Sequence, residues 1–397
     1  MSLIGQSVTI IGAGVAGLAV ARALALRGAS VTVLEQAEAV GEVGAGLQIS
    51  PNGAAVLRAL GLGAALEAAA TRTEAVELID GVTGKQVARL EVGRLRPGQG
   101  QGYHFLHRAD LIGLLLAGAV EAGVTLRLAT RISSVDLDGP VPAVVLDGGA
   151  RRETSLLIGA DGLHSCVRAA LNGPETPFFT RQVAWRALIP CAPGAAPVAE
   201  VHMGPGRHLV SYPLRGGTMR NIVAVEEREK WAGESWSLRD GSRDLRLAFD
   251  GFSPRLRGWL DQVEDPWLWG LFRHEVAATW TSPKGVAILG DAAHPTLPFL
   301  AQGASMGLED AWVLADALAT HDTVAAALQA YQSARKARTS RIVAAANGNA
   351  RAYHLSGLSR VVGHAGLRLI GQVAPGVLLS RFDWLYGHDV TAGRKIS

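Results

Sequence analysis

The chain has 397 residues, of which 48% are apolar, so it can bury a sizeable core in two domains or in one large elaborated domain. Its formal net charge of +3 is small for this length, and no Lys/Arg cluster supports a nucleic-acid partner. Cys166 and Cys191 form no close-spaced motif, so the sequence predicts no disulfide framework and no metal site, as in a reducing cytoplasm.

The first stretch, from Ser7 to Glu35, predicts a strand, a helix and a second strand. Val8 to Ile11 and Val31 to Leu34 are apolar runs typical of buried strands. Val15 to Arg27 has helical composition and stops before a glycine. This order is one βαβ unit.

Three glycines, Gly12, Gly14 and Gly17, follow the first strand in G-x-G-x-x-G spacing. The first allows a tight turn, the second lets the backbone approach a pyrophosphate, and the third lets helix and strand pack closely. Unpaired N–H groups and the dipole at the helix N-terminus favour the anion. Glu35 lies 18 residues past Gly17, where a carboxylate can accept both hydrogen bonds of a ribose diol. The stretch predicts dinucleotide binding.

The next segments predict a helix from Ser50-Pro51 to about Leu60, and then strands in residues 74–90 that leave the nucleotide domain. A further helix opens near Arg108. Two interpretations of this arginine stay open, namely an ion pair with Asp110 at the helix end and a contact with a cofactor's phosphate or ribityl group.

Strands are predicted in residues 124–136 and 143–148 and from Ser155 to Ala160. The last of them ends in Asp161-Gly162. An acid at the carboxyl edge of a parallel strand is where cofactors bind in open α/β sheets. A common Asp-Gly turn is the alternative, and the following sequence HSCVR makes it less attractive.

Residues 180–227 contain four strand-like segments, RQVAWRALIP, VAEVHMG, RHLVSYPL and MRNIVAVEE, which predict an antiparallel sheet beside the nucleotide domain. His208 and Tyr212 are four residues apart on one strand and therefore share a face with Val210. Residues 240–262 predict a helix, which the Trp-rich segment DPWLWG follows.

A second informative stretch begins at Val286 to Leu289, a predicted strand that ends in Gly290-Asp291. After a Pro-rich loop, Gly303 starts a helix of about 16 residues, whose N-terminus can bind an anion or a developing negative charge. His294 is interpreted as a structural loop histidine. Residues 323–397 predict helices, and residues 361–379 are too polar and interrupted for a membrane span.

Together, the glycine fingerprint with Glu35, the Asp161-Gly162 bend and the segment GDAAHP at 290–295 resemble the class A FAD-dependent aromatic hydroxylases. The likeness covers nearly the whole chain. It is closest to the branch of salicylate hydroxylase, 3-hydroxybenzoate 6-hydroxylase and 6-hydroxynicotinate 3-monooxygenase. The segments HRADL (107–111), GRHLVSYPLRGG (206–217) and RFDWLYGHDV (381–390) carry that closer likeness.

The resemblance implies an extended FAD. Glu35 would hold the adenosine ribose, Arg108 the phosphate–ribityl region, and Asp161 and Asp291 further parts of the cofactor. Gly303 and Ala304 would present N–H groups to the flavin pyrimidine ring, whose reduced form is anionic. The cofactor contacts that the resemblance carries over are Gly12, Gly14, Ala16, Gly17, Glu35, Gln36, Gly46, Leu47, Arg108, Ile132, Asp161, Asp291, Pro298, Gly303 and Ala304.

The implied chemistry is hydroxylation of an electron-rich ring. NADH or NADPH reduces FAD, O₂ adds at flavin C4a, and the hydroperoxide attacks a phenolic or hydroxypyridine ring, which we expect to carry a carboxylate. Because a phenolate is more nucleophilic than a phenol, a base helps, and His208 is the candidate. Tyr212 would orient the substrate, and Gln302 would lie where flavin and substrate meet. The alternative for His208 is a packing histidine of the sheet.

The resemblance also implies an α/β fold, with a Rossmann-like FAD-binding domain, an antiparallel-sheet substrate domain and C-terminal helices, as in p-hydroxybenzoate hydroxylase. The expected FAD-binding segments are residues 1–73, 103–178 and 276–345. The expected substrate-domain segments are 74–102 and 179–275, and the helical region is 346–397.

Three rival functions share the scaffold. A halogenase would carry the motif W-x-W-x-I-P, but Trp267-Leu-Trp269 is followed by Gly-Leu-Phe. A flavoprotein reductase would consume reduced nicotinamide without needing O₂, and a non-catalytic FAD-binding regulator would bind FAD alone. The ring, the choice of NADH or NADPH, coupled decarboxylation and a homodimer all stay open.

Overall fold

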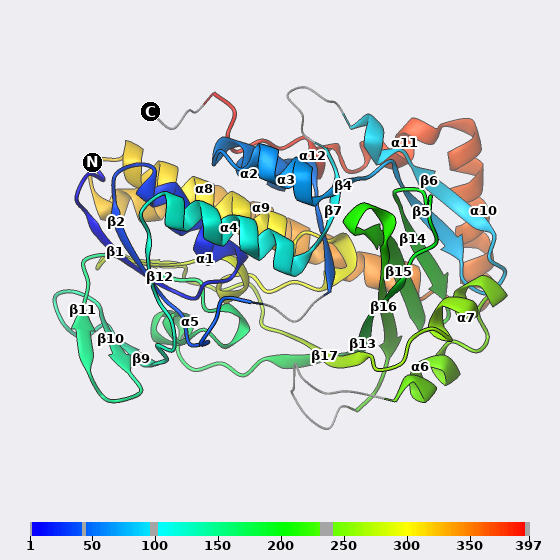
Figure 1. Ribbon diagram of the computed structural model, residues 1–397, viewed down its shortest axis with the longest axis horizontal. Helices are drawn as coiled ribbons and strands as arrows, with labels where there is room; N and C mark the ends of the chain where they lie inside the picture. The colour runs from blue at the N-terminus through cyan, green and yellow to red at the C-terminus, as the bar shows by residue number, and fades with distance from the viewer. Residues whose placement is uncertain (1, 42–44, 96–101, 231–240, 394–397) are drawn as a thin grey trace.

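The computed structural model describes residues 2–41, 45–95, 102–230 and 241–393 (Figure 1). A six-stranded sheet forms one half of the molecule, in the order β18-β19-β12-β1-β2-β8. All its pairs are parallel except β18 with β19. Its strands are β1 (Ser7–Ile11), β2 (Ser30–Leu34), β8 (Thr125–Arg127), β12 (Leu157–Gly159), β18 (Thr281–Ser282) and β19 (Val286–Ile288).

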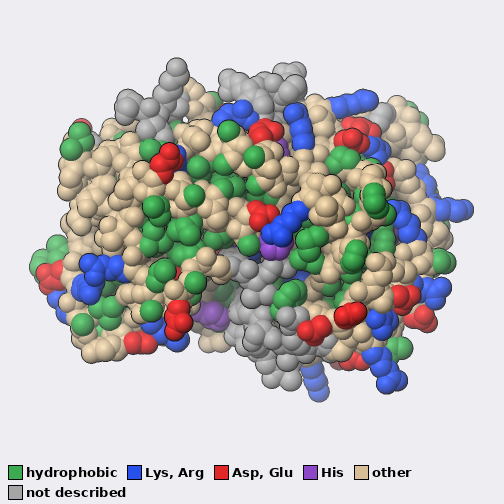
Figure 2. All heavy atoms as spheres, viewed as in Figure 1, with side chains coloured by type: hydrophobic (Ala, Val, Ile, Leu, Met, Phe, Trp, Pro, Cys, Tyr) green, Lys and Arg blue, Asp and Glu red, His purple; other side chains and the backbone are tan. Residues whose placement is uncertain are grey.

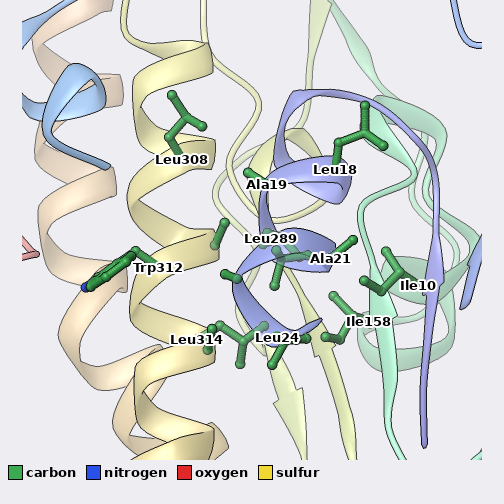
Figure 3. Close-up of a cluster of buried hydrophobic side chains, with 14 of the residues drawn as sticks. Ile10, Leu18, Ala19, Ala21, Leu24, Ile158, Leu289, Leu308, Trp312 and Leu314 are labelled. Carbon is green, nitrogen blue, oxygen red and sulfur yellow. The ribbon is translucent and has the colours of Figure 1, made fainter. Parts of the chain in front are cut away.

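Four helices pack with this sheet, and Figure 1 shows them as one layer. They are α1 (Val15–Ala25), α4 (Arg108–Glu121), α8 (Gly303–Thr320) and α9 (Val324–Tyr353). Figure 3 shows part of the core, where Ile10 and Ile158 from the strands, Leu24 from α1 and Trp312 from α8 are fully buried. Each such side chain contributes about 1.5–3 kcal/mol on burial. The predicted βαβ unit is confirmed, and so are the strands predicted before Asp161 and before Asp291, which are β12 and β19.

A seven-stranded sheet forms the other half, in the order β17-β13-β16-β15-β14-β5-β6. The four segments predicted over residues 180–227, now β13 to β16, pair antiparallel as expected, and β5 joins them through a parallel pair with β14. The reason is the long connection over residues 91–197, which returns the chain to the free edge of β5 in the same direction. The strands are β5 (Ala75–Asp80), β6 (Gln86–Leu90), β13 (Phe178–Pro190), β14 (Val198–Gly204), β15 (Arg207–Leu214), β16 (Met219–Glu227) and β17 (Trp267–Arg273).

The two faces of this sheet pack against different parts of the protein. On one face Trp185 and Leu209 pack against α6 (Ser242–Ala248) and α7 (Pro254–Leu260). The single helix predicted over residues 240–262 is therefore wrong, and residue 240 lies outside the described residues. Pro254 cannot sit inside a helix but fits the first position of a new one. On the opposite face Tyr212 packs toward the half that contains the six-stranded sheet.

The remaining elements are short sheets and helices. The described strands also include β3 (Gly46–Ile49), β4 (Thr71–Arg72), β7 (His104–His107), β9 (Ile132–Asp136), β10 (Ala143–Leu146) and β11 (Arg151–Glu153). The helices are α2 (Pro51–Ala59), α3 (Gly63–Ala69), α5 (Cys166–Asn172), α10 (Gly357–Val373), α11 (Pro375–Ser380) and α12 (Asp383–Tyr386). The 3₁₀ turns are η1 (Val92–Arg94), η2 (Gly162–His164), η3 (Arg215–Gly217), η4 (Gly290–Ala292) and η5 (Pro298–Leu300).

The surface carries mixed charges. On the face shown in Figure 2, acidic and basic side chains are interspersed with apolar ones. Over the described part of the chain, the search for helices with the length and hydropathy of a membrane span finds none.

Helix α9 connects the two halves. It has 30 residues, about 45 Å of helix. Near its start, the Tyr331 hydroxyl donates to the carbonyl of Ile288 in the six-stranded sheet (3.0 Å). Its last residue, Tyr353, and the capping residue His354 reach His208 on β15. On this topology we propose domain boundaries close to residues 73, 102, 178, 275 and 345, although residues 96–101 of the second segment lie outside the described residues.

Candidate functional site

The glycine fingerprint forms the turn between β1 and α1. Gly12 has φ +99°, and a Cβ there would lie 2.4 Å from the carbonyl oxygen of Ala160. A Cβ at Gly17 would lie 2.0 Å from the oxygen of Gly12. The predicted tight turn and close packing are confirmed. A Cβ at Gly14, by contrast, would meet nothing within 4 Å among the described residues. The N-terminus of α1 therefore has room for a pyrophosphate.

Glu35 follows β2 and turns back to this glycine loop. Its Oε2 accepts from the backbone N–H of Ala13 (2.7 Å), and its Oε1 accepts from that of Ala37 (2.9 Å). A carboxylate has about four acceptor sites, so it keeps capacity for ribose hydroxyls. The neighbouring Gln36 is exposed. The position is suited to the predicted ribose contact.

Asp291, in η4, and Arg108, at the start of α4, influence one another. Burial raises the pKa of Asp291, and His294 and Arg108 oppose that rise. Burial lowers the pKa of Arg108, and Asp291 opposes it. Yet Asp291 is solvent-accessible and Arg108 is only half-buried, so both side chains are open to a bound cofactor. Asp110, the other partner considered for Arg108, ion-pairs with Arg215 (3.0 Å).

Asp161 follows β12 and caps α5. Its carboxylate accepts from the Ser165 hydroxyl (2.5 Å) and from the backbone N–H of Cys166 (2.8 Å). Burial raises its pKa, and these hydrogen bonds oppose the rise. The predicted bend is confirmed, and the cofactor contact stays a prediction for the accessible part of this half-buried residue.

Ala16, another predicted cofactor position, lies where three elements begin. A Cβ at Gly290 would lie 3.0 Å from the Cβ of Ala16, and one at Gly307 would lie 3.1 Å from it. The starts of α1, η4 and α8 therefore meet at Ala16. Leu47 on β3, Ile132 on β9 and Pro298 on η5 are all partly accessible.

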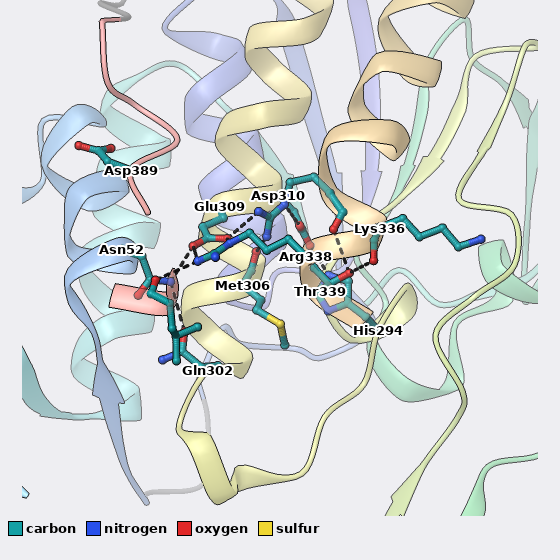
Figure 4. A network of polar contacts seen from close by, with 12 residues as sticks. Asn52, His294, Gln302, Met306, Glu309, Asp310, Lys336, Arg338, Thr339 and Asp389 are labelled. Carbon is teal, nitrogen blue, oxygen red and sulfur yellow. Dashed lines mark hydrogen bonds and ion pairs between the residues drawn. The ribbon is translucent and has the colours of Figure 1, made fainter. Parts of the chain in front are cut away.

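The N-terminus of α8 offers backbone donors. Gly303 and Ala304 are partly accessible, and no described side chain caps the helix. Gln302 behaves differently, because its side chain is only 1% exposed and points toward α2 (Figure 4). It donates to the Ser50 hydroxyl (2.9 Å) and accepts from Asn52 (3.2 Å). Ser50 is the predicted N-cap residue of α2, but its side chain does not cap the helix.

A buried ionic network fixes α8 on α9 (Figure 4). Glu309 pairs with Arg335 (2.6 Å) and Arg338 (2.8 Å), and Asp310 pairs with Arg335 (2.7 Å). Asp310 also accepts from the backbone N–H of Gly290 (3.0 Å) and binds His294. The network thus anchors the loop that carries Asp291, and it supports the structural interpretation of His294.

Asp310 predicts a pH dependence of stability. Burial opposes its charged form, but His294 and Arg335 lower its pKa to about 2. The unfolded value is about 3.9, so ionised Asp310 stabilises the fold above about pH 4, and this contribution is lost as the pH falls toward 2. Urea midpoints between pH 5 and 3 should fall less steeply in Asp310→Asn than in the wild type. The surface variant Asp250→Asn is the control, and equal slopes in Asp310→Asn and the wild type would contradict the assignment.

His208 and Tyr212 share the predicted face of β15. Tyr212 stacks on Phe105 with ring centroids 4.8 Å apart, and a Cβ at Gly46 would lie 2.8 Å from its ring. Burial raises the pKa of Tyr212. His208 is 1% exposed, and its ring lies 5.0 Å from that of Phe299 in η5. Burial, and then His354, lower the pKa of His208 well below its usual value, so the imidazole is neutral at pH 7.

Three residues near this face were not predicted from the sequence. Arg186 on β13 lies over the ring of Trp269 (4.4 Å), and burial, then Arg108, lower its pKa to about 10. His354 is hydrogen-bonded to His208, and Glu227 is hydrogen-bonded to His354. An arginine inside the otherwise apolar run VAWRAL was a signal for the first. His354 and Glu227 are distant from His208 in the sequence, and no local pattern indicates that they contact it.

Residues 6–346 match the family described as FAD binding domain, and the chain belongs to that family. It is 35% identical over 391 residues to the 3-hydroxybenzoate 6-hydroxylase of Polaromonas naphthalenivorans (strain CJ2), with 96% of each chain covered. It is 32% identical over 419 residues to the salicylate hydroxylase of Pseudomonas putida, with 98% and 93% covered. A solved salicylate hydroxylase substrate complex has the same fold, with a TM-score of 0.81 at 22% identity over 98% and 97% of the two chains.

The fingerprint, the fold and these relatives define a class A flavin hydroxylase. The protein is an FAD-dependent aromatic-ring monooxygenase, and the reductase and regulator alternatives are not favoured. The room at Gly14, the accessible Asp291 and Arg108, and the uncapped start of α8 all fit FAD.

Replacing Asp291 or Arg108 by alanine should weaken FAD binding. Loss of one charge-assisted hydrogen bond costs about 1.5–3 kcal/mol, roughly 10–150-fold in affinity. Flavin fluorescence on titration of the apoprotein measures the dissociation constant, and circular dichroism checks that the chain stays folded. Arg215→Ala, which breaks only the nearby surface pair with Asp110, is the control. Wild-type affinity in both variants would remove these residues from the site.

Proposed function

We propose that the protein hydroxylates a phenolic or hydroxypyridine ring that carries a carboxylate, using NAD(P)H and O₂. The observation that carries the proposal is His208, a buried imidazole whose Nε2 has no hydrogen-bond partner among the described residues. Its ring lies 5.0 Å from that of Phe299 in η5, and Phe299 is three residues before Gln302, the N-cap residue of α8. Bound FAD would supply the reduction of O₂ and the transfer of one oxygen atom.

We assign His208 as the base that removes the proton of the substrate hydroxyl through Nε2. A neutral imidazole with one unprotonated ring nitrogen can accept that proton. Tyr212 would orient the ring, and the backbone at Gln302 would lie where flavin and substrate meet. Glu35, Arg108, Asp161 and Asp291 would hold the cofactor, with Gly303 and Ala304 at its pyrimidine ring.

Arg186 supports a carboxylated substrate. Its Nε has no hydrogen-bond partner among the described residues, and the charge lies close enough to Tyr212 for the two to influence each other. A guanidinium in a partly desolvated recess attracts a carboxylate, which it binds in bidentate geometry. We propose that Arg186 pairs with the carboxylate of the substrate.

The two unbridged cysteines support a reducing, cytoplasmic location.

A substrate panel tests the proposal. 3-Hydroxybenzoate, salicylate and 6-hydroxynicotinate, which the names of relatives contain, head the panel, followed by other hydroxypyridines and hydroxyquinolines. NADH or NADPH oxidation and hydroxylated product are both measured, because a non-substrate effector can release only H₂O₂. Product from one or more compounds is expected. Nicotinamide oxidation without any hydroxylated product would overturn the proposal in favour of a reductase.

A further inference from the structure

We propose that His208, His354 and Glu227 form a proton relay that carries the hydroxyl proton of the substrate from the buried site to the protein surface. The inference rests on the proposed function, because it requires His208 to be the base. His354 and Glu227 do not touch the substrate in this scheme, so both are positioning residues.

The relay is a continuous hydrogen-bonded chain across three elements. His208 Nδ1 lies 2.7 Å from His354 Nε2, and His354 Nδ1 lies 2.7 Å from Glu227 Oε1. The exposure of the side chains increases along the relay. The side chain of His354 is 3% exposed and that of Glu227 is 53% exposed. The chain therefore begins at a fully buried nitrogen and ends at a carboxylate in contact with water.

The partners determine where the hydrogens lie. An ionised carboxylate only accepts hydrogen bonds, so His354 must donate to Glu227 from Nδ1. Neutral His354 then accepts at Nε2, and His208 must donate from Nδ1. The remaining nitrogen of His208, Nε2, is left as an acceptor, and it is the atom with no partner among the described residues. Glu227 thus sets the tautomer of a histidine two hydrogen bonds away.

The surroundings explain why a relay is needed. The ring of His208 packs against Phe299, Tyr353 and His354, with centroids 5.0, 5.2 and 4.9 Å away. Its cross-strand neighbours are Met203 on β14 and Val225 on β16. An imidazolium held there would be a buried charge without a carboxylate in contact, which is costly. A relay avoids this cost because the charge moves on to Glu227.

Two further ionisable groups face the relay. Arg207, next to His208 on β15, opposes a charge on His354, and Tyr353 is a half-buried phenol whose pKa is raised to about 12 by burial. Burial is the largest effect on the pKa of His354 and lowers it, while Glu227 raises it and Arg207 lowers it further. Both histidines are therefore neutral between transfers at pH 7.

The transfer balances in three proton movements. The substrate O–H bond breaks and an N–H bond forms at Nε2 of His208, while the Nδ1 proton of His208 passes to Nε2 of His354. The Nδ1 proton of His354 passes to Glu227, which releases it to water. The substrate becomes a phenolate, each imidazole has exchanged one N–H for the other, and one proton reaches the solvent.

Nitrogen NMR of the FAD-loaded protein, labelled with ¹⁵N-histidine, tests the tautomers without any turnover. The variants His208→Gln and His354→Gln assign the two ring systems. Both neutral rings are expected to carry hydrogen at Nδ1 and none at Nε2. A His208 protonated at Nε2 in the resting protein would overturn the relay, whatever the activity of the enzyme.

Kinetics of Glu227→Gln and His354→Gln test the transfer. At neutral pH kcat should fall about 10–100-fold, as for comparable partners that orient a histidine, with an unchanged KM for the substrate. The loss should shrink at alkaline pH, where the substrate is ionised in solution. Matched controls are Glu226→Gln, the neighbour that pairs with Arg207 and Arg228, and His364→Gln, which breaks a histidine–carboxylate pair with Asp80 elsewhere. Both should keep the wild-type kcat and pH profile.

The outcomes separate the two proposals. If His208→Ala is slow but Glu227→Gln and His354→Gln match the wild type at every pH, the relay is wrong and the base assignment stands. Equal losses at all pH values in the relay variants would also overturn the relay, because they indicate a packing role. If the wild type hydroxylates no compound of the panel, the proposed function fails and the relay fails with it.

Discussion

His208→Ala should slow hydroxylation about 10²–10⁴-fold at neutral pH, the usual contribution of a general base. Without Nε2 as acceptor, the enzyme has to act on the small phenolate fraction that exists in solution. FAD content should stay normal, because we propose no cofactor contact for this side chain. The rate should recover as the pH rises toward the pKa of the substrate hydroxyl, and the ultraviolet shift of bound substrate reports its ionisation.

The matched control for this variant is His202→Ala. His202 is also buried in the seven-stranded sheet, but it pairs with Glu200 and packs edge-on against Trp259 near α7. Its removal should cost stability at every pH and leave the pH profile of kcat unchanged. Normal hydroxylation by His208→Ala at neutral pH, or a loss that does not depend on pH, would show that His208 only packs.

Arg335→Met should destabilise the fold by about 3–5 kcal/mol, because it leaves two carboxylates buried without their shared partner. Glu309 and Asp310 are both fully buried, and Arg335 bonds to each of them. Urea unfolding of the apoprotein measures the change. The same network holds the loop that carries Asp291, so FAD affinity should fall as well.

Two further variants locate the origin of that loss. Arg341→Met, which removes an exposed guanidinium lying over Trp384, should change stability by at most about 1 kcal/mol. Adding Asp310→Asn to Arg335→Met should recover part of the loss, because one of the two buried carboxylates that lost Arg335 no longer carries a charge. If Arg335→Met alone unfolds at the wild-type urea concentration, the buried network does not stabilise the fold.

Much of the fold could be predicted from the sequence because its signals are local. Spacing placed Gly12 and Gly17 in a βαβ turn, and the short-range geometry of that turn requires glycine there. Alternation along one strand placed His208 and Tyr212 on one face, since side chains alternate with period two. The prediction of a single helix over residues 240–262 was wrong, because it relied on helical composition and gave too little weight to the break at Pro254.

The parts that could not be predicted depend on contacts between distant residues. His208 and His354 are 146 positions apart, and no periodicity connects a strand residue with the cap of a later helix. The parallel pairing of β5 with β14 is likewise a property of the returning chain. Gln302 was placed correctly at the start of α8, but only packing turns its side chain toward Ser50 and Asn52.

The strand order of the six-stranded sheet also determines when this sheet can be completed during synthesis of the chain. Strand β1 pairs with β12, and β12 pairs with β19, so the first strand of the chain depends on one that ends at Ile288. At about 5–20 residues per second, a ribosome needs roughly 15–55 s to make the intervening chain. During that interval the apolar side of α1 lacks α8, its later partner. We therefore expect FAD to bind late in synthesis, after β19 and α8 have been made.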